Sequence, residues 1–243
     1  MPATPILDSS VDVTFFIPCF NEASHIRGVL DKLVRVAGEL QMSYEILVFD
    51  DASTDRTADV VRDYQATNKD IPVCLFELSA NRGVARNFVE GAFQGHGEYY
   101  RLICGDDVEP VETHLEILRR RGQAEIIVPY FTRIDGRRLY RTVLSRIYTI
   151  LVNLMSGNTM RYYNGCPLYR RFDVLRFHIE ATGFGYQAEF LTRLLQEGRS
   201  YIEVPLVARD RPGSGSLSAR NVLSVAHSLL KIALRRLRVY LIK

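Results

Sequence analysis

The sequence contains no apolar run long enough to cross a membrane. A spanning helix needs about 20 consecutive apolar residues, and no segment of the 243-residue chain approaches that length. A charged-then-apolar leader is also missing, because residues 1–10 form a short polar segment. From these absences we expect an intracellular protein that is not an integral membrane protein.

Cysteines are few and far apart. Cys19, Cys74, Cys104 and Cys166 form no CxxC pair, and three of them lie in or beside apolar, strand-like runs. This placement favours reduced, buried thiols in a cytosolic protein over disulfides or a zinc site. The signatures GxGxxG and GxxxxGKS/T are absent as well, so neither a dinucleotide-binding fold nor a P-loop is indicated.

The chain also lacks a strong net charge. A formal charge of +3 is too small to argue for a nucleic-acid partner. The charges are unevenly placed, since acids cluster in the first half and arginine dominates 119–146 and 209–243. With 47% hydrophobic residues, the chain can bury one sizeable core without being divided.

Apolar, strand-like runs alternate with segments of helical periodicity. Strands are expected at Val11–Pro18, Tyr44–Asp50, Pro72–Leu78, Tyr99–Cys104, Ala124–Tyr130 and Tyr201–Val207. Helices are expected at Glu22–Leu40, from a Ser53 or Thr54 cap to about Asn68, and at Val84–Gln94, Phe184–Gln196 and 217–243. Tyr162–Tyr169 is expected to return to the sheet edge. The alternation predicts an α/β fold with a mostly parallel, Rossmann-like central sheet flanked by helices.

Two of the predicted strands end in acidic loops. One strand leads into Asp50-Asp51, and another into Gly105-Asp106-Asp107. A parallel sheet brings both ends to the edge where such sheets bind ligands. Adjacent carboxylates repel each other unless a cation holds them, so a divalent metal and a diphosphate are natural ligands. The alternative is that these acids only cap helices.

Four motifs of the first half carry a resemblance to a known family. They are IPCFNE (Ile17–Glu22), FDDASTD (Phe49–Asp55), NRGVARN (Asn81–Asn87) and the acids of CGDD. Together with YNGCPLYRR (Tyr163–Arg171), GFGYQAEFLTRLLQEG (Gly183–Gly198), YIEVPL (Tyr201–Leu206) and RPGSGS (Arg211–Ser216), they resemble family 2 glycosyltransferases of the GT-A fold. The branch they resemble contains dolichyl- and polyprenyl-phosphate sugar transferases.

The resemblance implies a donor site for a nucleoside-diphosphate sugar and a divalent cation, Mg²⁺ or Mn²⁺. Asp106 takes the place of the second acid of the family's DxD metal motif, and Cys104 takes the place of the first. Neutral cysteine is a poor magnesium ligand, so Asp107 is the candidate to compensate. The residues expected to line the nucleotide pocket or close over it are Pro18, Asn21, Glu22, Asp51 (on the base), Arg211 and Ser216.

The second half is expected to bind the acceptor. Arg141 and Ser145 lie four residues apart on one face of an arginine-rich amphipathic helix, a geometry that suits a phosphate; the alternative is a solvated face. By resemblance they would bind a polyprenyl (dolichyl-type) phosphate, with Arg133 as a weaker candidate. Gln187 and Glu189 would lie on the acceptor side, and Glu189 is equally compatible with a buried structural role.

We expect a catalytic domain over 1–208, followed by a lid loop and a basic amphipathic helix over 209–243. That helix either packs on the domain or lies in the plane of an anionic membrane. We favour the membrane, which predicts a peripheral protein at the inner membrane face. The expected reaction is a metal-dependent, inverting sugar transfer. Two rivals remain: transfer to a sugar hydroxyl, with Asp107 or Glu189 as base, and a catalytically weak nucleotide-binding module. A nucleotidyltransferase is a weaker alternative.

Overall fold

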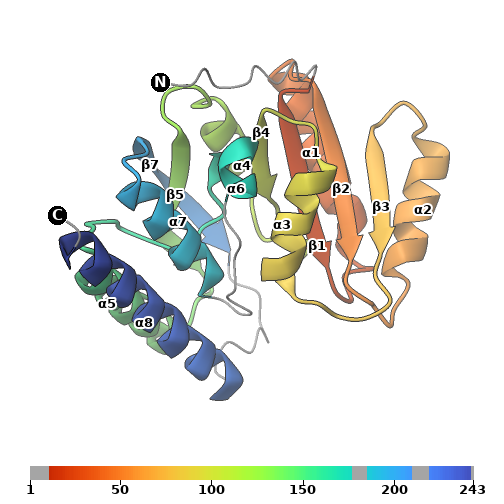
Figure 1. Cartoon of the computed structure of the whole chain (residues 1–243). Coiled ribbons are helices and arrows are strands. Elements are labelled where there is room, and N and C mark those ends of the chain that lie inside the picture. Colours follow the sequence, from red (N-terminus) through yellow and green to blue (C-terminus); the bar gives the residue numbers. More distant parts are fainter. Residues whose placement is uncertain (1–10, 177–184, 210–218, 242–243) are drawn as a thin grey trace.

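A seven-stranded sheet organises the molecule (Figure 1). The computed structural model describes residues 11–176, 185–209 and 219–241. The strands are β1 (Val13–Cys19), β2 (Tyr44–Asp50), β3 (Val73–Glu77), β4 (Tyr99–Leu102), β5 (Ile126–Asp135), β6 (Leu168–Arg170) and β7 (Tyr201–Arg209). The helices are α1 (Ile26–Glu39), α2 (Thr57–Thr67), α3 (Val84–Gln94), α4 (Val111–Leu118), α5 (Leu139–Ser156), α6 (Arg171–Leu175), α7 (Tyr186–Gln196) and α8 (Ala219–Leu241).

The sheet is mostly parallel, as predicted. Its strand order is β3-β2-β1-β4-β6-β5-β7. β1 pairs in parallel with β2 and β4, and β5 pairs in parallel with β7. β6 runs antiparallel to both of its neighbours, β4 and β5. The segment expected at the sheet edge therefore contributes a short strand inside the sheet, and the carboxyl ends of β1, β2 and β4 share one edge.

Helices cover both faces of the sheet, which explains why its strands read as continuous apolar runs. One core cluster joins the sheet to α1, α2 and α4. A second joins its other face to α3, α7, α8 and one side of α5. Along β1, Phe15 and Ile17 belong to the first cluster and Phe16 to the second, as the two-residue repeat of a strand requires.

Some predicted boundaries were wrong for identifiable reasons. β5 extends to Asp135, well beyond Tyr130, because it pairs with β7 to its end. α2 begins at Thr57 and has no side-chain cap, so Ser53 and Thr54 do not cap it. The Ser53 hydroxyl instead accepts a hydrogen bond from the backbone N–H of Asn21, 2.9 Å away. The four cysteines are free, as expected, but Cys74 is exposed rather than buried.

α8 is attached to two helices of the domain, α5 and α7. The Arg236 guanidinium donates to the Leu154 carbonyl at 2.7 Å and lies against Gly157, whose φ of +78° closes α5 in the left-handed region. On the other side Ser228 lies so close to Gly185 that a β-carbon there would fall 2.2 Å from its hydroxyl. Within the described ranges, no helix has the length and apolar character needed to cross a membrane. The predicted division at residue 209 stays a prediction.

Candidate functional site

A cavity of about 580 Å³ lies where the ends of β1 and β4 face helices α5 and α7. Its size falls within the ~300–1,000 Å³ typical of ligand sites. It is lined by Pro18, Glu22, Val84, Leu102, Cys104, Gly105, Asp106, Arg137, Arg141, Leu144, Ser145, Tyr148, Tyr162, Asn164, Cys166, Tyr186, Gln187 and Val225. Six of the predicted site residues are among them: Pro18, Glu22, Asp106, Arg141, Ser145 and Gln187. The acidic and the basic parts of the predicted site thus open into one space.

The loops after β1 and β2 are joined by side chains that were predicted to bind nucleotide. The Asn21 amide oxygen accepts hydrogen bonds from the backbone of Thr54 at 2.8 Å and of Asp55 at 3.3 Å. Both carboxylate oxygens of Asp51 accept backbone hydrogen bonds, from Arg82 at 2.7 Å and Gly83 at 2.8 Å, directly before α3. Neither side chain lines the cavity. Asn21 and Asp51 therefore fix the rim of the site, and contact with a base stays a prediction.

Asp106 and Asp107 follow the same strand but point to different places. Asp106 lines the cavity. Asp107 has a φ of 60°, and its carboxylate lies 2.7 Å from the Lys32 ammonium on α1. Because Asp107 does not line the cavity, the structure gives it a bracing role and leaves Asp106 as the acid of this loop that faces the cavity.

Cys104 lies beside a second thiol, with its sulfur 3.9 Å from that of Cys166. The hydrogen bond between them and the burial of the group raise the pKa of the Cys104 thiol well above its ordinary value. A thiol kept neutral in this way is a poor ligand for Mg²⁺. In the described part of the chain, no three His, Cys, Asp or Glu side chains gather to hold a metal ion.

Helix α5 presents a polar stripe to the cavity. Arg141, Ser145 and Tyr148 recur at helical spacing, and all three line it, together with Arg137 just before the helix. Among the described residues, the buried Tyr148 hydroxyl and the Arg137 Nε have no hydrogen-bond partner. Burial also raises the pKa of Tyr148. Buried polar atoms are normally paired, so these two groups, which sequence reasoning missed, are available to a polar ligand in the cavity that they line.

The remaining predicted residues lie elsewhere. Arg133 is largely exposed and pairs with Asp135 at 2.8 Å, outside the cavity lining. Glu189 is buried on α7, where the Arg235 guanidinium of α8 lies 3.5 Å from its carboxylate, a placement that favours the structural alternative. Arg211 and Ser216 lie outside the described residues.

A buried polar network supports the floor of the cavity. Arg101 on β4 is fully buried and donates to the Glu109 carboxylate at 2.9 Å and to the Cys166 carbonyl at 3.1 Å. His114 on α4 lies 2.6 Å from the same guanidinium, and burial together with Arg101 lowers the His114 pKa well below its usual range. The arginine therefore ties both ends of the Asp106 loop and the Cys166 segment to a rigid core.

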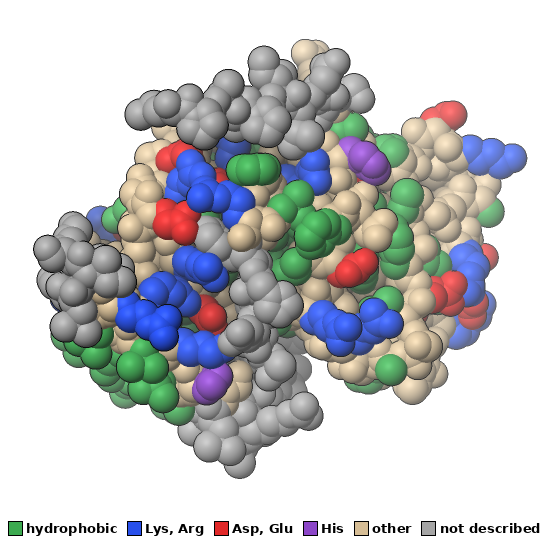
Figure 2. All heavy atoms as spheres, viewed as in Figure 1, with side chains coloured by type: hydrophobic (Ala, Val, Ile, Leu, Met, Phe, Trp, Pro, Cys, Tyr) green, Lys and Arg blue, Asp and Glu red, His purple; other side chains and the backbone are tan. Residues whose placement is uncertain are grey.

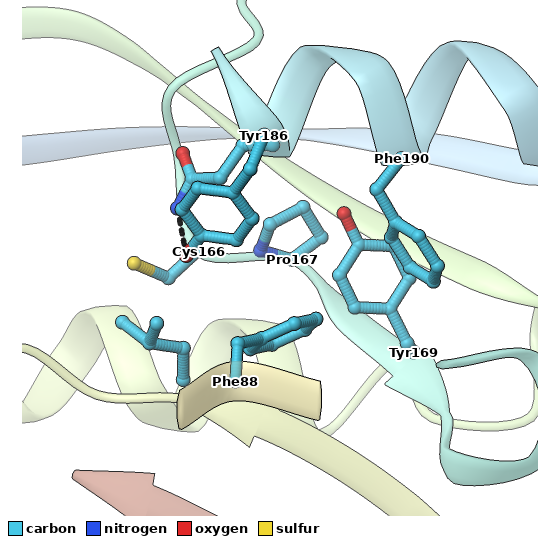
Figure 3. A pocket seen from close by; sticks show the side chains of 8 residues that line it. Phe88, Cys166, Pro167, Tyr169, Tyr186 and Phe190 are labelled. Atoms are coloured by element: carbon cyan, nitrogen blue, oxygen red, sulfur yellow. Dashed lines mark hydrogen bonds between the residues drawn. The ribbon is translucent and has the colours of Figure 1, made fainter. Parts of the chain in front are cut away.

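A much smaller pocket lies beneath the same wall (Figure 3). Its volume is about 10 Å³, about one water molecule. Phe88 sits among Tyr169, Tyr186 and Phe190, with ring centroids 5.6–6.2 Å from it. This pocket is a gap in an aromatic layer that supports Cys166 and Tyr186, and it is too small to hold a substrate.

Comparison with known proteins identifies the family of the chain. The family model for glycosyl transferase family 2 matches residues 14–177. Undecaprenyl-phosphate 4-deoxy-4-formamido-L-arabinose transferase of Photorhabdus laumondii is 24% identical over 226 residues, which cover 90% of this chain and 66% of that protein. Dolichyl-phosphate beta-glucosyltransferase of Dictyostelium discoideum is 28% identical over 102 residues, which cover 40% of this chain and 31% of that protein. The chain thus spans about two thirds or less of these relatives.

Solved structures share the fold at low identity. Mannosyl-3-phosphoglycerate synthase from Rubrobacter xylanophilus aligns over 95% of this chain and 75% of its own, with a TM-score of 0.67 and 16% identity. A mannosyltransferase from Pyrobaculum calidifontis, solved with GDP-Man and Mn²⁺, aligns over 95% of this chain and 67% of its own, with a TM-score of 0.65 and 20% identity. These likenesses establish the GT-A fold. With the family model spanning more than half of its length, the chain belongs to glycosyl transferase family 2.

Proposed function

We propose that the protein transfers a sugar, with inversion, from a nucleoside-diphosphate sugar to a polyprenyl (dolichyl-type) phosphate. The observation that carries this proposal is that Asp106 and the Arg141–Ser145 pair line one cavity. An acid suits the metal-bound diphosphate of a donor, and an arginine suits the phosphate of an acceptor. The names of relatives that act on undecaprenyl and dolichyl phosphate support the same acceptor class.

The donor end would be the part of the cavity lined by Pro18, Glu22 and Asp106. Mg²⁺ or Mn²⁺ commonly binds through one or two carboxylates plus substrate phosphates. The residues present fit an ion held by Asp106, with Glu22 as a second carboxylate, provided that the diphosphate completes the coordination. When bound, such an ion would neutralise the charge of the departing diphosphate. Asp106 orients that group, and the Arg101 network keeps its loop in place.

The acceptor end would be the polar stripe of α5. Arg141 lies in the first turn of the helix, where the helix dipole also favours an anion. A phosphate monoester is already ionised at neutral pH (second pKa ~6), so it can attack the anomeric carbon without a general base. A hydroxyl acceptor would need one, and neither Asp107 nor Glu189 lines the cavity. This difference favours the phosphate acceptor over the hydroxyl alternative.

The test is ligand binding followed by transfer. In a panel of nucleoside diphosphates, the one that binds should raise the melting temperature in the presence of Mn²⁺. A ligand at about 100 times its Kd adds ~2.7 kcal/mol to the free energy of unfolding. Labelled sugar from the matching donor should then appear on polyprenyl phosphate. Binding without transfer to any phosphate or hydroxyl acceptor would favour the weak nucleotide-binding module, which the neutral Cys104 keeps as the second candidate. Absence of any nucleotide binding would contradict both.

Tyr148→Phe should separate stability from ligand binding. Because its hydroxyl is buried without a partner, removing it should raise the free energy of unfolding of the ligand-free protein by about 1 kcal/mol. The same change should weaken binding of a short-chain prenyl phosphate by about tenfold, the value of a hydrogen bond to a charged group. Urea unfolding and calorimetry measure the two effects. The control is Tyr140→Phe, on the exposed side of α5, which should change neither stability nor ligand affinity. Unchanged ligand affinity in Tyr148→Phe would show that Tyr148 does not bind the ligand.

A lipid-linked acceptor implies that the protein works at a membrane surface. We therefore retain the proposal of a peripheral protein at the inner membrane face, with a lipid phosphate as its acceptor and no nucleic-acid partner. The basic C-terminal helix, now α8, was the element expected to make that contact.

A further inference from the structure

Two thiols meet at the wall of the cavity. Cys104 follows β4 and Cys166 precedes β6, and these two strands pair antiparallel. Antiparallel pairing brings the residues after one strand beside the residues before the other, so two cysteines 62 positions apart in sequence become neighbours. Their sulfurs lie 3.9 Å apart, and both residues line the cavity. Figure 3 shows the Cys166 sulfur pointing away from Tyr169 and Phe190.

The pair is arranged for a disulfide rather than for a metal. In the ranges that the structure describes, no group of three His, Cys, Asp or Glu side chains could hold a metal ion. A disulfide needs only the two sulfurs, at a separation of about 2.05 Å. In proteins of reducing compartments, such bonds are usually transient and serve catalysis or redox sensing. A thiol pair inside a candidate active site is therefore a candidate for reversible oxidation.

We propose that Cys104 and Cys166 form a reversible disulfide by exchange with a small disulfide of the glutathione type, and that this bond inactivates the donor end of the cavity. The sulfur of Cys104, the less buried of the two, attacks the reagent and releases one thiol. The sulfur of Cys166 then attacks that of Cys104 in the mixed disulfide and releases a second thiol. Two protons end on the released thiols, and two electrons pass from the protein sulfurs to the reagent. The inactivation rests on the proposed function, whereas the bond itself does not.

The state of the Cys104 thiol affects the rate of this exchange. Its pKa lies well above the ordinary value because of the hydrogen bond with Cys166 and because of burial. The thiolate is the attacking species, so a neutral thiol reacts slowly. We therefore expect the exchange to take minutes to hours, the usual range for uncatalysed disulfide rearrangement.

Cys166 is the fixed partner of the pair. Its carbonyl accepts a hydrogen bond from the guanidinium of Arg101 at 3.1 Å, and Arg101 is fully buried. To form the bond, the sulfurs must approach from 3.9 Å to about 2.05 Å. Because Arg101 holds one side in the core, most of this movement falls on the segment that contains Cys104 and Gly105.

Gly105 passes such a movement on to the donor end of the cavity. A β-carbon on Gly105 would fall 3.0 Å from the Cys19 sulfur and 3.3 Å from the Pro18 carbonyl oxygen. The backbone of the loop is thus packed closely against the end of β1. A shift of Gly105 changes the position of Asp106 relative to Pro18, and a misplacement of about 1 Å in an active site can cost about 10²-fold in rate.

Cys74 provides a control thiol. It is exposed on β3, the strand at one edge of the sheet (Figure 1), and neither β3 nor its neighbour β2 contains another cysteine. Figure 2 shows acidic and basic side chains together at this edge of the molecule, where Arg62 pairs with Asp59 at 2.8 Å. Such a single, solvated thiol should take up one glutathione and form no internal disulfide.

Peptide mapping after incubation with glutathione disulfide tests the bond without any substrate. Trypsin should release peptide 102–119 joined to peptide 162–170, which contain Cys104 and Cys166 respectively. Dithiothreitol should separate the two peptides. Cys74→Ser should give the same joined pair, and Cys104→Ala should give none. Absence of the joined pair from the folded wild-type protein, or a link from Cys104 to a different cysteine, would overturn the proposal.

Transfer rates before and after the same incubation test the inactivation. Oxidised wild type and Cys74→Ser should lose transfer by about tenfold or more, and dithiothreitol should restore it. Cys104→Ala, compared with its own rate before incubation, should not respond. An unchanged rate in protein that carries the joined peptides, or an equal loss in Cys104→Ala, would contradict the inactivation. If the reduced protein transfers no sugar, the proposed function fails, and the joined peptides alone decide whether the disulfide forms.

Discussion

Asp106→Asn should reduce sugar transfer by about 10²–10³-fold, the usual cost of removing one preorganised electrostatic contact in an active site. Asparagine keeps the shape of the side chain and removes its charge. If Asp106 holds the ion that neutralises the donor diphosphate, the variant should also lose the ability of Mn²⁺ to increase nucleotide affinity. Initial rates of transfer, and calorimetric titrations with nucleoside diphosphate in the presence and absence of Mn²⁺, measure the two effects.

The neighbouring residue provides the control. Asp107→Asn changes the same charge one residue away, but Asp107 pairs with Lys32 and does not line the cavity. We expect transfer within a few-fold of wild type and a loss of at most about 1 kcal/mol of stability, as for a partly exposed ion pair. Equal damage from the two substitutions would mean that the whole loop, rather than Asp106, matters. Full activity in Asp106→Asn would exclude a metal held by this carboxylate.

The fold could be predicted because the residue pattern of each strand depends on whether its two faces are buried. Tyr44–Asp50 reads as an unbroken apolar run, and such a run bounded by turns fits a strand covered on both faces. β6 was harder to predict because it is only three residues long. Its antiparallel place between β4 and β5 depends on contacts far along the chain, which no local pattern contains.

The site was only partly predictable for a related reason. A polar residue at a strand end can face a ligand or hold a neighbouring loop, and both uses select the same residue types. Asp51 accepts hydrogen bonds from residues 31 and 32 positions away, so its partners are invisible in the sequence around it. Tyr148, by contrast, could have been found, because it continues the helical spacing of Arg141 and Ser145.

Helix α5 shows the limit of amphipathic patterning. Its apolar residues predict one hydrophobic side, but not what covers that side. Among its residues only Thr149, Val152 and Ser156 are buried, while the leucine and isoleucine stripe faces outward. The direction in which an apolar face points depends on the neighbouring elements, and here the face that normally meets the core remains exposed.

Arg141→Ala should abolish transfer to a polyprenyl phosphate nearly completely, by about 10²-fold or more, because an arginine pairs with phosphate through charge-assisted, often bidentate hydrogen bonds. Transfer to a sugar hydroxyl would not need that contact and should change little. Arg141→Lys should recover only part of the rate, since an ammonium keeps the charge but not the planar pair of donors. The loss should appear as a higher KM for the acceptor and a lower kcat, with the KM for the donor unchanged.

Arg133→Ala separates this specific role from a general effect of positive charge. Arg133 was the weaker phosphate candidate in the sequence, and it is exposed, paired with Asp135 and absent from the cavity lining. Its loss should leave transfer to a soluble prenyl phosphate within a few-fold of wild type. If both arginine variants lose phosphate transfer equally, the α5 stripe is not the acceptor site. If Arg141→Ala keeps phosphate transfer, the acceptor is bound elsewhere and the unpartnered Tyr148 hydroxyl must serve another ligand.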